Sequence, residues 1–453
     1  MAQKRILTQD EIDRYMNNLY ELNELSEDGL EYSDDDDVDF LPDCVSPNED
    51  SDSDCENSVG SQNTIQNIKK SDDYNKLNRN ISAREPFINL TFKNNKTLPK
   101  NILWKNQNIS LNEEVIKFYG DDTLRREIMD FDTPYQFFKY LWTDKIINNI
   151  YDESIRYAIQ KNPSKPLTIS KNEINQYLGI CIYASLVHLP NYRAYWSEEL
   201  GFDQIKETMP LKKFETIRQY LHFIDNDKHL PRDHPNHDRL HKIRPIYDEL
   251  NKNFAKVPLE RHLSIDEQIC STKVRHYMKQ YLPMKPHKWG FKFFVLCGIL
   301  GFAYKLELYS DQENNEKYRQ KGEPGLGASA NVVIRLARII SRNKNYTLYF
   351  VNYYTSIPLL AYLSKEEICS LGTINKNRIP ISKISTEKVF NQMERGHSME
   401  FFGNNNDVEI SVTAWKDNKT VIMASTFAGE KQLGKVMRYD KKIKNREEIT
   451  SCH

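Results

Sequence analysis

The spacing of apolar residues changes twice along the chain and divides it into three regions. In residues 1–85 the apolar residues are sparse and are separated by acidic runs such as SDDDDVDF (33–40) and NEDSDSDCENS (48–58). Runs of this kind bury too little apolar surface to offset the entropy that is lost when a chain becomes ordered. We therefore predict that residues 1–85 form a disordered acidic tail.

The second region has apolar residues at three- and four-residue intervals, a spacing typical of amphipathic helices. Ser170 and Asn172 stand at the start of one of these segments, where either residue is a plausible helix N-cap. We predict a mostly helical region over residues 86–257. Its helical segments are SLNEEVIKFYG (110–120), TPYQFFKYLWTDKIINNIYDESIRYAI (133–159), KNEINQYLGICIYASLVHL (171–189) and LKKFETIRQYLHFI (211–224).

After Pro258 the apolar period becomes two, which indicates strands. Three strands come first, with a tight turn at Gly301 between the second and third; a helix, a strand, a helix and a further strand follow, and then a hairpin that turns at Asp417 and Asn418. This order matches a ribonuclease-H-like α/β core, a common scaffold for two-metal phosphoryl transfer. We place this core at residues 258–428 and a basic segment at residues 429–453. In chain order, the segments are HLSIDEQIC, GFKFFVLCGI, FAYKLELYSD, NVVIRLARIISR, YTLYFV, SIPLLAYLSKEEI, CSLGTI and ISVTAWKDNKTVIMAST.

The net charge of −1 conceals a strong asymmetry between the two ends of the chain. Residues 1–90 hold 22 acidic and 8 basic side chains, a balance of −14, so residues 91–453 keep 42 acidic and 55 basic ones, a balance of +13. An acidic tail on a basic body is typical of a protein whose partner is a polyanion. In such a protein the tail competes with the polyanion for the basic residues of the body. A tail that only improves solubility remains the alternative.

Asp266 is the residue with the clearest potential for metal chemistry. It interrupts the apolar alternation of LSIDEQIC, and a charged side chain in such a place needs a partner or an ion. Two-metal nucleases hold their ions between carboxylates at this part of the scaffold, and Mg²⁺ requires oxygen ligands. From the residues alone, Asp266 is either a metal ligand or a structural acid in a salt bridge.

Several longer blocks resemble the piggyBac transposase family, and they occur in the order found in that family. They cover roughly residues 85–445 and are MPLKKFETIRQYLHF (209–223), DRLHKIRPIYDEL (238–250), IDEQIC (265–270), YLPMKPHKWGFK (281–292), GLGASANVVIRL (325–336), NYYTSIPLL (352–360), GTINKNR (372–378) and VTAWKDNKTVIMAST (412–426). The resemblance implies an enzyme that cuts and pastes DNA with three aspartates on a ribonuclease-H-like core, the DDE arrangement.

Carried over by position, the first of these aspartates falls on Asp266 and the second on Val351. The neighbouring Asn352 should face away from Asp266, because successive strand residues point to opposite faces. The third belongs to a glycine-rich block that does not appear before residue 453, and Asn375 stands where an arginine is usual. We therefore expect no catalytic activity and no cofactor, with Mg²⁺ relevant only if some nuclease activity survives.

Basic and aromatic residues are interleaved just after Asp266, a pattern that suits phosphate contacts and base stacking. The alternative is that the aromatic residues belong to the core and the lysines form a solvated face. The resemblance favours a DNA-facing surface, with contacts that do not depend on sequence. The predicted DNA-binding residues are Lys273, Arg275, Lys279, Lys285, Lys288, Trp289 and Lys292.

Four histidines, His229, His234, His237 and His241, lie close together in DKHLPRDHPNHDRLH. A zinc site is conceivable there, although the prolines and aspartates around them favour a surface loop. The resemblance and the basic clusters, of which KVMRYDKKIKNR (435–446) is the best candidate signal, predict a nuclear protein. We expect DNA as its partner, possible self-association, and neither a membrane nor a small-molecule substrate. A protein-interaction module without DNA binding is the main alternative.

Overall fold

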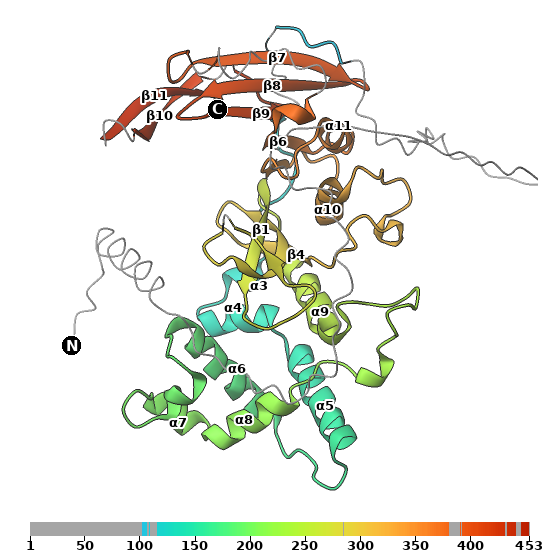
Figure 1. Cartoon of the computed structure of the whole chain (residues 1–453), viewed down its shortest axis with the longest axis vertical. Helices are drawn as coiled ribbons and strands as arrows, with labels where there is room; N and C mark the ends of the chain where they lie inside the picture. The colour runs from blue at the N-terminus through green and yellow to red at the C-terminus, as the bar shows by residue number, and fades with distance from the viewer. Residues whose placement is uncertain are drawn as a thin grey trace, which may run out of the picture. The chain divides into compact units, whose positions relative to one another are not determined.

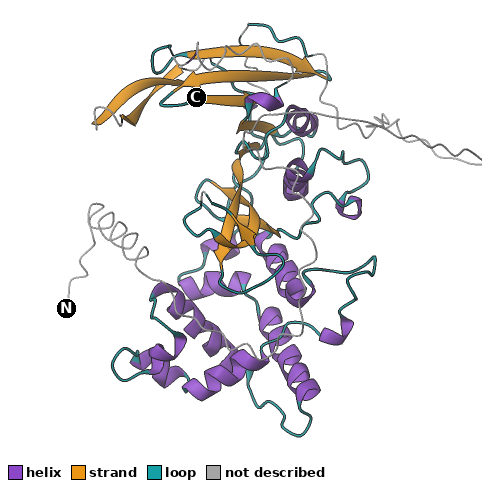
Figure 2. Cartoon of the chain, in the orientation of Figure 1, coloured by secondary structure: helices purple, strands orange, loops and turns teal. Residues whose placement is uncertain are grey.

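The computed structural model describes residues 102–106, 108, 116–283, 285–379, 390, 392–430, 433–440 and 445–452. The predicted disordered tail at residues 1–85 lies outside the described residues. Figure 2 shows helices dominating the earlier part of the described chain and strands dominating the later part. This change follows the switch in apolar period after Pro258.

Three of the four predicted helical segments fold into helices, whereas residues 117–120 of the segment predicted at 110–120 are not helical. Thr133 and Ser170 each form a capping box, in which Gln136 and Glu173 return the hydrogen bond to the backbone of the cap residue. The helices between residues 144 and 254 contribute to one apolar cluster, which includes fully buried isoleucines such as Ile146. The helices are α3 (Arg126–Met129), α4 (Pro134–Leu141), α5 (Asp144–Lys161), α6 (Lys171–Leu186), α7 (Asp203–Thr208), α8 (Leu211–Tyr220) and α9 (Arg244–Phe254).

A mixed sheet forms the second region, and its strand order is β2-β3-β1-β5-β6-β9-β8-β7, with β4 paired to β3. Strand β1 runs antiparallel to β3 but parallel to β5, which in turn runs parallel to β6. The predicted order of strands and helices is confirmed. The strands are β1 (His262–Ser271), β2 (Gln280–Tyr281), β3 (Trp289–Gly298), β4 (Ala303–Leu308), β5 (Thr347–Phe350), β6 (Cys369–Thr373), β7 (Ser398–Asn405), β8 (Val408–Lys416) and β9 (Thr420–Ser425).

Two helices, α10 (Ala328–Leu336) and α11 (Ile357–Lys365), connect the parallel strands and pack on the sheet. Helix α10 buries nearly all of its side chains, including Arg335, which forms an ion pair with Glu307 of β4. Helix α11 starts at the N-cap Ser356, whose hydroxyl accepts a hydrogen bond from the Leu359 amide, and Pro358 follows in the first turn. The main apolar core lies between these helices and the sheet.

A short segment from the beginning of the described chain, residues 102–106, belongs to this sheet rather than to the helices. Lys105 forms an antiparallel bridge with Phe402 of β7, with a 2.8 Å hydrogen bond in each direction. Ile102 and Trp104 are each only 3% exposed and join the main core. Both approach Gly403 so closely that a Cβ there would lie 2.7 Å from either side chain. Figure 1 draws this segment in blue beside β7.

Sequence periodicity did not predict three features of the sheet region. Strand β7 breaks the apolar alternation because Glu400 is buried inside it, where it accepts a 2.7 Å hydrogen bond from the Ser411 hydroxyl. Strand β2 is only two residues long. Strands β10 (Leu433–Asp440) and β11 (Asn445–Cys452) form a separate antiparallel hairpin within the segment predicted as basic.

Within the described residues, no helix combines the length and apolarity that crossing a bilayer requires.

Candidate functional site at Asp266 and Val351

Asp266 lies in the middle of β1, and Val351 directly follows β5. In the parallel ladder between these strands, the last pair is Ile265 and Phe350, so Asp266 and Val351 are the residues that follow that pair. The Val351 side chain is 38% exposed.

The Asn352 side chain is engaged within the turn that follows β5. Its side-chain amide donates a 3.3 Å hydrogen bond to the amide oxygen of Asn375. Arg378 holds the same turn, because one guanidinium nitrogen donates to the carbonyl oxygens of Asn352 and Tyr353, each at 2.9 Å. The turn after β5 therefore presents an amide and a cation where a metal site would need acids.

Asp266 and its neighbour Glu267 share one electrostatic environment. Partial burial, together with the hydrogen bond and like charge of Glu267, raises the pKa of Asp266. Burial also raises the pKa of Glu267, but the hydrogen bond with Asp266 and the charges of Lys285 and Lys292 outweigh it and leave the pKa below its ordinary value. Glu267 is thus the carboxylate that the fold keeps ionised.

Glu267, which follows Asp266 in β1, belongs to a compact polar network. Lys285 lies 3.4 Å from the Glu267 carboxylate and donates a 3.3 Å hydrogen bond to its backbone carbonyl. The hydroxyl of the fully buried Tyr354 donates to Glu267 at 3.4 Å. The Lys292 ammonium lies 4.6 Å from the centre of the Tyr353 ring, and burial lowers its pKa. Of the predicted DNA-binding residues, Lys285 and Lys292 are therefore engaged in internal contacts.

Glu267→Gln is expected to lower the free energy of unfolding by about 1 to 3 kcal/mol at pH 7, because two half-buried lysines lose their counter-charge. A folded pKa below the ordinary value of 4.5 means that the ionised carboxylate stabilises the fold above that pH. The difference between wild type and variant should shrink as the pH falls through the folded pKa. Urea denaturation between pH 3 and pH 8 measures this.

Glu448→Gln is the matched control for this substitution, since Glu448 pairs with Lys435 at 2.9 Å but both side chains are more than half exposed. Such a surface pair contributes less than about 0.5 kcal/mol. Equal losses for the two variants, or a Glu267→Gln loss that persists at pH 3, would contradict the proposed ion-pair network.

The excursion between β1 and β3, residues 272–289, carries the other predicted DNA-binding residues, and we call it the basic loop. Lys273, Arg275 and Lys288 are exposed on it, whereas Lys279 is half-buried. The Lys279 ammonium lies 5.4 Å from the centre of the Trp289 ring. The structure thus brings these cations onto one surface loop next to the end of β1.

The aromatic residues of the basic loop are not part of the core. Tyr277, Tyr281 and Trp289 are 46%, 50% and 52% exposed, which excludes the core alternative for their rings. Tyr277 stacks on His276 with ring centres 4.5 Å apart. It also lies within 6 Å of the guanidinium groups of Arg232 and Arg239. Cations and exposed rings therefore alternate along the loop.

Three of the four clustered histidines approach one another without converging on a point. The ring of His229 lies 5.1 Å from that of His237 and 4.8 Å from that of His241, with which it is nearly parallel. One nitrogen of His237 and one of His241 contact backbone carbonyls. Within the described residues, no group of three or more His, Cys, Asp or Glu side chains is arranged to hold a metal ion.

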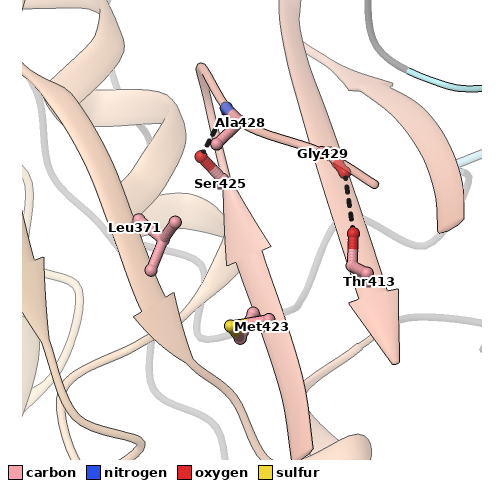
Figure 3. Close-up of a pocket in the computed structure, with 7 residues that line it drawn as sticks. Leu371, Thr413, Met423, Ser425, Ala428 and Gly429 are labelled. Atoms are coloured by element: carbon pink, nitrogen blue, oxygen red, sulfur yellow. Dashed lines mark hydrogen bonds between the residues drawn. The ribbon is translucent and has the colours of Figure 1, made fainter. Parts of the chain in front are cut away.

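Two cavities in the described part of the chain lie away from Asp266. One, of about 20 Å³, has room for a single water molecule and lies over β6, β8 and β9, lined by residues that include Leu371 and Met423 (Figure 3). The Ala428 amide, which also borders it, donates a 2.9 Å hydrogen bond to the Ser425 hydroxyl. A larger one, of about 440 Å³, opens beside the starts of β5 and β6, at the opposite ends of these strands from Val351. Neither cavity forms a site with Asp266.

Sequence reasoning missed two residues that shape the site. Glu267 was overlooked because adjacent acids in a strand give no indication of which one faces the interior. Arg378 lies within the quoted GTINKNR block, but only the structure reveals that its guanidinium supports the turn after Val351. Glu267 and Arg378 hold neighbouring protein groups in position. A sequence pattern seldom reveals a role of this kind.

Comparisons with known proteins agree with this architecture. Residues 133–452 match the family described as Transposase IS4. Human PiggyBac transposable element-derived protein 3 is 30% identical over 323 residues, which are 70% of this chain and 52% of that protein. Human PiggyBac transposable element-derived protein 2 is 27% identical over 322 residues, with the same shares of the two chains. The chain therefore spans about half the length of these relatives.

A solved structure has a similar fold. The cryo-EM structure of the piggyBac transposase synaptic complex with hairpin DNA aligns with a TM-score of 0.51 at 18% identity, over 71% of this chain and 66% of that chain. At this identity the likeness concerns the fold alone. The extent of the family match and the two named relatives lead to one conclusion: the chain belongs to the piggyBac transposase family.

Proposed function

We propose that this protein is a catalytically inactive member of its family that binds DNA without sequence preference through the basic loop. The strand order β4-β3-β1-β5-β6, with β3 antiparallel to β1 and two parallel strands on its other side, supports a ribonuclease-H-like core. On such a core two acids of a two-metal site stand within the first strand and just after the first parallel strand beside it. We assign those positions to Asp266 in β1 and to Val351 after β5.

The inactivity rests on Val351. Phosphoryl transfer by two metal ions depends on carboxylates that fix both ions and stabilise the attacking and leaving oxygens. A valine side chain supplies no ligand, and the neighbouring Asn352 is directed to Asn375 instead. Glu267, the other carboxylate nearby, is engaged with Lys285. Without an acid at position 351, Asp266 and Glu267 supply too few oxygen ligands to fix two Mg²⁺ ions.

The DNA binding rests on the basic loop, whose exposed cations are the single observation that carries the proposal. Cations contact phosphates and release counterions. The charge balance of +13 over residues 91–453 adds long-range attraction for a polyanion. Lys285 and Lys292 are engaged in internal contacts, so we assign phosphate contacts mainly to Lys273, Arg275 and Lys288.

Replacing Lys273, Arg275 and Lys288 together with glutamine is expected to weaken duplex binding and to flatten its salt dependence. Each phosphate contact contributes about 0.9 to the slope of log K against log salt, so three lost contacts change the slope by about 2 to 3. Fluorescence anisotropy with a mixed-sequence duplex, from about 50 to 200 mM salt, measures both quantities.

The matched control replaces three other exposed lysines, Lys165, Lys344 and Lys365, with glutamine and produces the same change in net charge. If both triple variants flatten the slope equally, the basic loop is not the DNA surface and binding reflects net charge alone.

A nuclear location, as expected for a chromatin-bound protein, belongs to the same proposal. Residues 435–446 are the candidate nuclear localisation signal.

A further inference from the structure

Tyr281 and Trp289 form a cross-strand pair at the outer end of the sheet. They are directly opposed where β2 meets β3, and their ring centres lie 4.7 Å apart. The backbone around Trp289 is fixed on both sides. The Thr272 amide donates to the Trp289 carbonyl at 3.2 Å, and the Leu282 amide donates to the Lys288 carbonyl at 2.8 Å. The two rings are therefore carried by an ordered backbone.

Despite this ordered backbone, about half of each ring is open to solvent. The Gly290 backbone packs tightly on β1, where an added Cβ would lie 2.3 Å from the Cys270 carbonyl oxygen, so the strand cannot turn inward to bury Trp289. Lys279 lies 5.4 Å from the Trp289 ring centre, and the exposed Lys288 is its neighbour in sequence. Two open rings and two cations thus occupy one edge of the basic loop.

This arrangement fits unstacked bases better than a closed duplex. In a B-form duplex the faces of the bases are covered by their neighbours, so exposed protein rings have nothing to stack on. In a single strand each base offers a face, and one stacking contact strengthens binding about 5- to 150-fold. Rings that are already ordered lose little freedom on binding. We propose that Tyr281 and Trp289 form a stacking platform for single-stranded DNA.

This inference rests on the proposed DNA binding and adds the form of DNA that the platform takes. The test uses the full chain and two fluorescent probes, a 20-nucleotide oligo(dT) and a mixed-sequence duplex of the same length, at one fixed salt concentration. Trp289→Ala is expected to weaken oligo(dT) binding at least fivefold and duplex binding less than twofold. Trp289→Phe, which keeps an aromatic ring, should retain oligo(dT) affinity within about threefold.

Tyr135→Ala is the matched control, since this tyrosine of α4 is 65% exposed and lies outside the basic loop. It should change binding to neither probe. Equal weakening of both probes by Trp289→Ala, or unchanged oligo(dT) binding, would overturn the platform while the proposed DNA binding stands. Failure of wild type to bind either probe would overturn the proposed function itself. Circular dichroism of each variant establishes that the fold is intact.

Discussion

Trp104→Ala is expected to lower the free energy of unfolding by about 3 to 5 kcal/mol, the usual cost of removing a fully buried large aromatic side chain. Trp104 is 3% exposed and packs against Gly403 of β7 within the main core. The bridge between Lys105 and Phe402 holds it there. A chain that begins after residue 106 should therefore lose a comparable amount of stability, although the sheet itself starts only at residue 262.

Leu103→Ala provides the control, because Leu103 lies in the same segment but is 81% exposed. It should change stability by less than about 0.5 kcal/mol. Urea denaturation followed by circular dichroism compares the two variants. If Trp104→Ala is as stable as Leu103→Ala, residues 102–106 are not part of the folded core.

Val351→Asp is expected to make the stability of the protein depend on divalent metal. The substitution adds a carboxylate directly after Phe350, whose partner in the parallel ladder, Ile265, directly precedes Asp266. Without metal, the two like charges should destabilise the fold by about 1 to 2 kcal/mol, since both side chains are partly open to solvent. With Mn²⁺ at about 100 times its dissociation constant, binding should restore about 2.7 kcal/mol.

Thermal unfolding with Mn²⁺ and with a chelator measures this effect. Wild type should melt at the same temperature in both conditions, and so should Val351→Asn, which adds a polar group without charge. The double variant Asp266→Asn, Val351→Asp should lose the metal response, because one carboxylate remains. A metal response in wild type, or none in Val351→Asp, would contradict the assignment of Val351 to the position of a lost acid.

The alternation of apolar residues predicted most of the central strands and helices. The resemblance, and not the alternation, assigned Asp266 and Val351 to the positions of the first and second aspartates. The structure adds that the ladder between β1 and β5 ends at Ile265 and Phe350, directly before these two residues, and that the Asn352 side chain is bonded to Asn375.

The contact between residues 102–106 and β7 could not be predicted from the sequence. The segment is too short to show a period, and its partner Phe402 lies about 300 residues further along the chain. Strand β7 was not predicted for a related reason. The burial of Glu400 and the close contact at Gly403 depend on neighbours that no local sequence pattern reveals.

The sequence also did not show whether the aromatic side chains of the basic loop are buried or exposed. An aromatic residue between lysines is equally compatible with a core ring and with an open one. Strand β2 has only two residues, so alternation cannot assign the face of Tyr281. Tertiary packing decides the matter, because the close contact of Gly290 with β1 leaves the neighbouring Trp289 outside the core.

The most direct test of the account is duplex binding by the wild-type protein, measured by anisotropy across a salt series, once with Mg²⁺ and once with a chelator. The account predicts clear binding at low salt, a steep loss of affinity as salt rises, and no difference between the two conditions beyond twofold. Binding that requires Mg²⁺ would contradict the claim that the metal site is lost. Absence of binding at low salt would contradict the claim that a DNA surface remains.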